Sequence, residues 1–315
     1  MDRARTGIKN SDTKNPGEGK PSLYASIRNF ILPFLGGFFM GIANLIPGVS
    51  GGTVALMIGI FEKLVNSLAN LSFKNVLSLL SGGSFIEKIK RYGFDFLMFL
   101  AVGALFSIVF GSKPVSFLLE NYPILTMIFF SGLIIGSLPI IFSDVTKKSK
   151  LLYAFLGFVF VLIMKLLENN YQNVDGSNGN LFFLALSGAL AMCAMVLPGV
   201  SGAFVLVLFG QYERIINAIN NFEYKILIIF GAGALVGIVL FSKILKFVFL
   251  KYKDAILSFF IGTMIAAAIF LPEGGILIFL ASYKNFSIFS LGLLISLIFS
   301  IYELKKKKLA KVGGD

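Results

Sequence analysis

The residues best suited to chemistry stand in two copies of Pro-Gly-Val-Ser-Gly, at residues 47–51 and 198–202, each inside an apolar run. Proline lacks a backbone N–H and clashes with the preceding helical turn, whereas glycine adopts conformations that are closed to other residues. Each copy therefore predicts a turn between two helices, with backbone amides and a serine hydroxyl at its tip. The positive end of the outgoing helix dipole points at the same tip, which suits it to binding an anion.

We predict that both tips bind the anionic group of a substrate. The first set of binding residues is Asn44, Pro47, Gly48, Val49, Ser50, Gly51, Gly52 and Thr53. The second set is Pro198, Gly199, Val200, Ser201 and Gly202. Because Met195, Ala203 and Phe204 replace Asn44, Gly52 and Thr53, we expect the second site to be poorer or asymmetric. The alternative is that Pro-Gly only kinks two packed helices, but repetition of the whole pentapeptide argues against it.

Charged residues follow each copy at equivalent positions, as Glu62-Lys63 and Glu213-Arg214. We interpret them as gating or coupling residues, in which the cations attract the anionic substrate and the glutamates hold the cations or carry protons. The alternative is an interfacial ion pair that ends a short helix.

Several chemistries are excluded by composition. The chain has no histidine and only one cysteine, Cys193, so disulfides within the chain, Cys/His metal sites and histidine general bases are ruled out. We therefore expect no catalytic residue, no metal and no cofactor, and a protein that is not an enzyme.

The elements that carry the tips are membrane helices. Of 315 residues, 57% are hydrophobic and 14% are charged, and the mean hydropathy is +0.87. This composition indicates an all-α, polytopic membrane protein. Stretches of about 20 apolar residues can cross a bilayer. We predict transmembrane helices at 94–112, 123–143, 151–168, 226–247, 254–272 and 285–302.

Each tip belongs to a segment that we expect to enter and leave the membrane on one side. The apolar run after each tip ends at Glu62 or Glu213, too soon for a full crossing, and a charge near the bilayer centre is costly. We therefore predict re-entrant hairpins at 30–70 and 181–221. Exposed amides cannot face lipid, so each tip must be buried in protein or line a wet cavity.

The two hairpins are parts of a tandem duplication. Residues 37–66 align with 188–217, and GALFSIVFGSK at 103–113 matches GALVGIVLFSK at 233–243. Three crossings between the hairpins make the second hairpin enter from the opposite face. We therefore predict two inverted repeats, at 29–168 and 181–304, each with one hairpin and about three transmembrane helices. This architecture is typical of secondary transporters that work by alternating access.

The net charge of +12 indicates membrane topology rather than nucleic acid binding. Most of the 28 lysine and arginine residues fall in segments that the predicted topology makes cytoplasmic. We expect a multi-pass protein of the bacterial cytoplasmic membrane. Its polar tail at 1–28 and its basic tail at 305–315 are expected to be cytoplasmic.

The motifs also resemble a known family. The pattern GxxxGxANxIPGVSGGTxAxxxGIFE from Gly37 to Glu62, with its echo LPGVSGAFVLVLFGQYE at 197–213, is similar to the PopT-type polyprenyl-phosphate translocases. The resemblance covers nearly all of residues 25–305. It implies recycling of undecaprenyl phosphate, the lipid carrier of envelope polymers, from the outer to the inner leaflet. The expected partners are this lipid and the membrane lipids around it, with a homo-oligomer and a coupling ion, proton or sodium, left open.

Two other function classes are considered. A small-anion channel or exchanger is the first alternative, because helix amino termini at mid-membrane also bind chloride or sulfate. A phosphatase acting on polyprenyl diphosphate is the second. It is disfavoured because Ser50 and Ser201 are followed by glycine rather than arginine and no histidine exists.

Overall fold

A computed structural model describes residues 23–82, 84–146, 151–171, 180–272, 275 and 282–312. Residues 1–22 of the expected amino-terminal tail and 313–315 of the expected basic tail lie outside this part. The basic residues at 147, 148 and 150, which entered the topology argument, also lie outside it.

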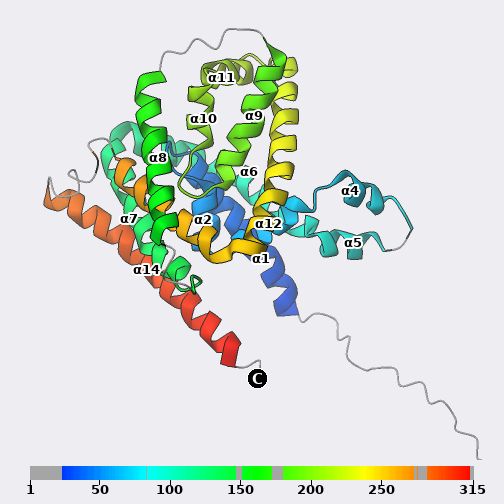
Figure 1. Ribbon diagram of the computed structural model, residues 1–315, viewed down its shortest axis with the longest axis horizontal. Coiled ribbons are helices and arrows are strands. Elements are labelled where there is room, and N and C mark those ends of the chain that lie inside the picture. The colour runs from blue at the N-terminus through cyan, green and yellow to red at the C-terminus, as the bar shows by residue number, and fades with distance from the viewer. Residues whose placement is uncertain are drawn as a thin grey trace, which may run out of the picture.

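The described part of the chain is helical, which confirms the all-α prediction. Its helices are α1 (Leu23–Asn44), α2 (Gly51–Met57), α3 (Phe61–Ala69), α4 (Phe73–Leu79), α5 (Phe85–Tyr92), α6 (Phe94–Asn121), α7 (Pro123–Phe142), α8 (Leu151–Tyr171), α9 (Leu181–Val196), α10 (Gly202–Leu208), α11 (Tyr212–Asn220), α12 (Tyr224–Phe270) and α14 (Tyr283–Val312). Figure 1 shows how they are arranged.

Within the described ranges, four helices are long and apolar enough to cross a membrane: α6, α7, α12 and α14. The pair α10 and α11, bent by 111°, forms a fifth candidate if it is one span. The chain is therefore a multi-pass membrane protein, as predicted. The span expected at 151–168 corresponds to α8, whose described apolar stretch, Leu151–Leu167, is shorter.

The spans expected at 226–247 and 254–272 lie on the two sides of a kink in α12. Its only break inside is Tyr252, with φ −134° and ψ 42°, where the ribbon turns sharply (Figure 1). The equivalent position in the first half is Tyr122, which separates α6 from α7 with φ −139° and ψ 48°. The same backbone conformation thus recurs at the same place in both halves.

Helix contacts recur in the two halves as well. Helix α1 packs on α6 as α9 packs on α12, and α7 packs on α14 as α8 packs on α12. Glycines bring the backbones together: a Cβ atom at Gly132 of α7 would lie 2.2 Å from the carbonyl oxygen of Phe289, and one at Gly262 of α12 would lie 1.8 Å from that of Ala154. Helices α7 and α8 of the first half therefore pack on α14 and α12 of the second half, so the halves are interleaved.

The largest buried cluster surrounds the bend of the first hairpin. Phe61 of α3 is fully buried and packs edge-on against Phe260 of α12, with ring centroids 5.5 Å apart. Residues of α2, α6 and α7 complete this cluster. It fixes the first hairpin against helices of both halves.

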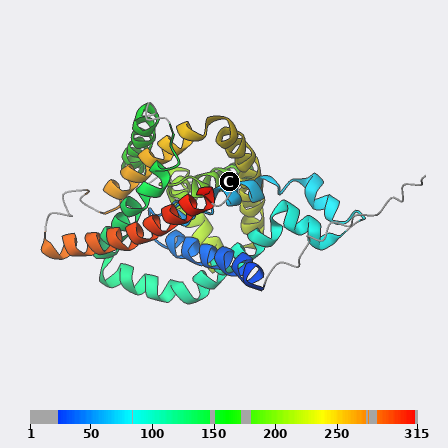
Figure 2. The same ribbon diagram turned by 90° about the horizontal axis from the view of Figure 1, so that it is seen from below.

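Helices α4 and α5 occur only in the first half, between α3 and α6. Figures 1 and 2 both show them projecting from the side of the helical bundle. The amine of Lys88 joins the end of α4 to the start of α5, because it donates hydrogen bonds to the carbonyl oxygens of Ser78, Ser81 and Gly82.

Candidate functional site

The two Pro-Gly-Val-Ser-Gly segments form turns between helices. Helix α1 ends at Asn44 and α2 begins at Gly51, while α9 ends at Val196 and α10 begins at Gly202. The second residue of each segment adopts the left-handed conformation, with φ +81° at Gly48 and +74° at Gly199. Glycine is needed there because side chains disfavour positive φ.

The two tips contact each other directly. The Ser50 hydroxyl donates to the carbonyl oxygens of Leu197 at 2.9 Å and Met195 at 3.1 Å. The backbone N–H of Gly199 donates to the Thr53 hydroxyl at 3.0 Å. In Figure 1, α1 rises from the lower end of the molecule and α9 descends from the upper end, so the tips meet in its interior. The structure thus brings together the two predicted sets of binding residues.

Donors of the first tip already have protein acceptors. Gly51 N–H donates to the Asn44 side chain at 2.8 Å, and Gly52 N–H donates to the Ser50 hydroxyl at 3.2 Å. Thr53 N–H donates to the Ser50 carbonyl at 3.0 Å. Ser50 is only 2% exposed. An anion could take these donors only after they leave their present partners.

The second tip is bonded differently. Met195 stands where the first tip has Asn44, so it offers Gly202 no side-chain oxygen. The Ser201 hydroxyl makes no cap hydrogen bond to α10, nor any to another residue that the structure describes. Ser201 is half-buried and Ala203 is exposed. The Ser201 hydroxyl at the start of α10 is therefore a donor that is free in this conformation.

Burial of the turns also differs. Pro47 and Gly48 of the first turn are exposed, whereas Pro198, Gly199 and Val200 of the second are buried. The carbonyl of Pro198 accepts a 2.8 Å hydrogen bond from the Thr263 hydroxyl of α12. The second turn is thus held against α12.

The charged residues after the tips do not pair with their sequence neighbours. Glu62 forms an ion pair with Lys253 of α12 at 2.5 Å, while the Lys63 amine lies over the Phe96 ring, 4.7 Å from its centroid. In the second half, Arg214 donates to the side-chain oxygen of the buried Gln211 at 3.3 Å. Glu62 and Lys63 thus hold the first hairpin to two different helices.

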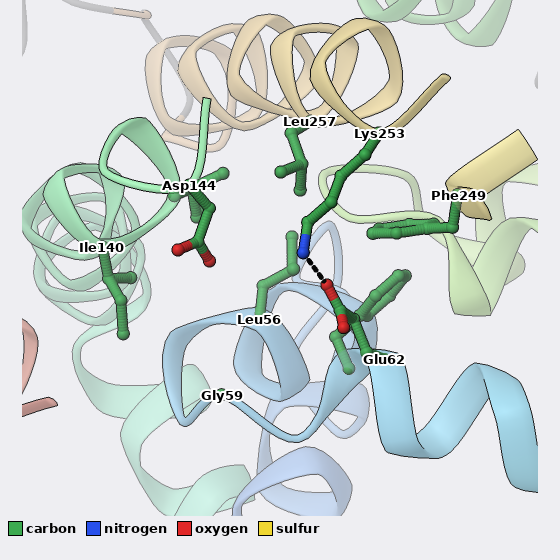
Figure 3. A pocket seen from close by; sticks show the side chains of 10 residues that line it. Leu56, Gly59, Glu62, Ile140, Asp144, Phe249, Lys253 and Leu257 are labelled. Atoms are coloured by element: carbon green, nitrogen blue, oxygen red, sulfur yellow. Dashed lines mark ion pairs between the residues drawn. The ribbon is translucent and has the colours of Figure 1, made fainter. Parts of the chain in front are cut away.

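The ion pair lies in a pocket of about 230 Å³ between the first hairpin, the end of α7 and the break in α12, shown in Figure 3. It is lined by Leu56, Gly59, Phe61, Glu62, Ile140, Ile141, Asp144, Phe249, Lys253 and Leu257. The sequence prediction missed Lys253 and Asp144. The sequence did contain a signal for Lys253. The equivalent residue of the first half, after Tyr122, is Pro123, so the lysine after Tyr252 departs from the repeat.

No three histidine, cysteine, aspartate or glutamate side chains of the described residues come together as metal ligands would. The chemistry available at the tips is that of neutral hydrogen-bond donors.

Comparison with known proteins agrees with these features. The family model described as undecaprenyl phosphate translocase-like matches residues 40–272, which include both tips. A polyprenyl-phosphate transporter of Vibrio cholerae is 34% identical over 244 residues, or 75% of this chain and 76% of that protein. A polyprenyl-phosphate transporter of Staphylococcus aureus is 29% identical over 284 residues, or 84% of this chain and 93% of that protein. No solved structure matches the chain.

Proposed function

Because the chain belongs to the undecaprenyl phosphate translocase-like family, we propose that it moves undecaprenyl phosphate across the bacterial cytoplasmic membrane, from the outer to the inner leaflet. There the lipid carrier is used again in envelope polymer synthesis. The two polyprenyl-phosphate transporters support this substrate class, since most of each aligns with the chain.

The observation that carries the proposal is the direct contact between the duplicated tips, through Ser50 with Leu197 and Thr53 with Gly199. A phosphate lying between Ser50 and Ser201 is close to donors of both halves. The Ser201 hydroxyl and the start of α10 receive it first, because they have donors to spare in this conformation. Donors of the first tip join when the phosphate replaces the carbonyl of Leu197 on Ser50.

Transport then proceeds by alternating access, in which one half rocks against the other and exposes the phosphate to each side in turn. The polyprenyl tail stays in the bilayer. Glu62 and Lys63 belong to the cytoplasmic half of the polar path, and Glu213 and Arg214 to the external half. The glutamates are the candidates for coupling to a proton or sodium ion.

This mechanism requires inverted repeats with both termini in the cytoplasm. It is supported by the opposite directions of α1 and α9 in Figure 1 and by the matching breaks at Tyr122 and Tyr252. It involves no bond cleavage, and the tip donors need only exchange one acceptor for another. The protein therefore acts as a carrier rather than a phosphatase.

The test is depletion of the protein in cells that lack redundant carriers, followed by measurement of undecaprenyl phosphate on the outer surface. Exposure on that surface should rise, and unchanged exposure contradicts the proposal. Anion flux into liposomes that contain the purified protein distinguishes this function from the main alternative, an anion channel or exchanger. A lipid carrier conducts neither chloride nor sulfate, whereas an anion channel or exchanger conducts at least one of them.

A further inference from the structure

The pocket at Lys253 combines one cation with apolar walls. Its hydrocarbon surface comes from three elements: Leu56 and Phe61 of the first hairpin, Ile140 and Ile141 of α7, and Phe249 and Leu257 of α12. The Lys253 and Glu62 side chains, which face each other in Figure 3, are 46% and 56% exposed, so the charged end of the pocket is open. A cavity of this kind fits an amphiphile with an anionic head and a hydrocarbon tail.

The ion pair in this pocket is exchangeable. Exposed lysine–carboxylate pairs contribute little to stability, because water competes for both groups. A lysine amine has three N–H donors, and in the described part of the chain the amine of Lys253 is paired with the carboxylate of Glu62. A phosphate monoester offers three oxygens and up to two negative charges, so it is a stronger partner for Lys253 than one carboxylate is.

The lysine of the pocket has no counterpart at the equivalent position of the other half. Tyr122 and Tyr252 break equivalent helices with the same backbone conformation, but the residue that follows is Pro123 in the first half and Lys253 in the second. Glu213, the equivalent of Glu62, therefore has no lysine at the corresponding position. The pocket marks the end that the proposed topology makes cytoplasmic.

We propose that Lys253 binds the phosphate of the lipid as it leaves the tips for the inner leaflet, in exchange for Glu62, while the apolar walls hold the first isoprene units. The identity of the lipid rests on the proposed function. Glu62 competes with the phosphate for Lys253, so the pocket holds an anion weakly. Weak binding suits a release site, because a tight site there would retain the product.

The test uses the purified full chain in lipid nanodiscs and a short prenyl phosphate that carries a photoactivatable diazirine. Labelling of the peptide around residues 249–257, read by mass spectrometry, reports occupancy of the pocket. Lys253→Gln should weaken labelling about tenfold, as loss of one charge-assisted hydrogen bond predicts. Glu62→Gln should strengthen it, because the competing carboxylate is removed. Lys251→Gln is the matched control: this lysine lies over the Phe247 and Tyr252 rings and does not line the pocket, so labelling stays unchanged.

The two substitutions separate exchange from a structural role. Both break the same ion pair, so a purely structural pair predicts effects in the same direction. Opposite effects support the proposal, and a gain in Glu62→Gln cannot come from misfolding. Equal losses, or no change in either variant, overturn the pocket proposal and leave the function intact if the lipid still crosses. Absence of prenyl phosphate labelling at both tips and pocket overturns the function itself.

Competition identifies the ligand. Unlabelled prenyl phosphate should displace the probe from the 249–257 peptide better than either inorganic phosphate or the corresponding prenol does. Equal displacement by inorganic phosphate would assign the pocket to the free anion, and equal displacement by the prenol would make it a purely apolar site. Either result overturns a role in lipid release.

Discussion

At the residue scale, the two tip serines are in equivalent positions but have different partners. Ser50 caps α2 and donates to carbonyls of the other tip, whereas Ser201 makes no cap hydrogen bond. The sequence indicated some asymmetry from Met195, Ala203 and Phe204, but it did not reveal that the first tip is the one whose donors are engaged.

Substitution of the two serines should therefore affect different properties. Ser50→Ala removes the cap of α2 and the hydrogen bonds that Ser50 donates to the second tip, so it should lower the free energy of unfolding by about 1–3 kcal/mol. Ser201→Ala should leave stability unchanged and weaken prenyl phosphate binding. Melting curves in detergent and binding measured on the same preparations check both results. Equal destabilisation by both substitutions would contradict the bonding described.

Gly199 should be among the least replaceable residues of the second tip. A residue with a Cβ atom would have to adopt positive φ here, which costs about 1–2 kcal/mol. Its Cβ would also lie 2.6 Å from the backbone carbonyl oxygen of Thr263. Gly59→Ala is the control, since Gly59 has φ +73° but open space around its Cβ position. Gly199→Ala should therefore lower the melting temperature clearly more than Gly59→Ala. A similar loss in the two variants would mean that α12 yields to the added atom.

At the scale of elements, Lys88 makes the largest set of hydrogen bonds within the projection formed by α4 and α5. It donates to the carbonyl of Ser78 in α4 and to those of Ser81 and Gly82 in the following turn, at 2.6 to 2.9 Å. Lys90, two residues away, is exposed, and its side chain makes no hydrogen bond with any residue that the structure describes.

Lys88→Met should accordingly loosen this projection without unfolding the bundle. Hydrogen–deuterium exchange across residues 72–92 should become faster, because the carbonyls lose the donor that joins the two helices. Lys90→Met removes the same charge and should leave exchange as it was. Equal acceleration in both variants would attribute the effect to charge rather than to the hydrogen bonds.

The presence of apolar helices and the positions of the two turns could be predicted from the sequence because they depend on local signals, apolar length and Pro-Gly. Helix ends could not, since α6 continues to Asn121 and α14 to Val312, beyond the apolar stretches expected at 94–112 and 285–302. The conformation at which α12 kinks could not, since it is adopted by Tyr252, which gives no proline or glycine signal. The partner of Glu62 could not be predicted from the sequence either. Glu62-Lys63 are neighbours in sequence, but successive helical residues point in different directions, and Lys253 is brought near by tertiary packing.

At the scale of the whole molecule, the proposed topology fixes which surfaces reach each side of the membrane. Leu80 after α4 and Tyr224 at the start of α12 are 84% and 68% exposed. In the proposed topology the first lies in the cytoplasm and the second outside.

Single cysteines at these two positions test the arrangement, in a chain whose own Cys193 is replaced by serine. Tyr224→Cys should react with an impermeant thiol reagent added to intact cells, and Leu80→Cys should react only after the cells are opened. Both cysteines should label fully in detergent, which controls for accessibility. Labelling of Leu80→Cys from outside would reverse the topology and with it the assignment of the Lys253 pocket to the cytoplasmic face.

The interleaving of the halves also governs how the chain is made. Helix α7 leaves the ribosome well before α14, yet the glycine face around Gly132 is covered by α14, the last helix that the structure describes. Helix α8 likewise waits for the second part of α12. Neither half can finish folding while it is being synthesised, so the nascent chain carries uncovered helix faces in the bilayer until translation ends. Loss of the last helix, by a late stop codon or by proteolysis, would therefore return α7 to that unfinished state and expose it to membrane quality control.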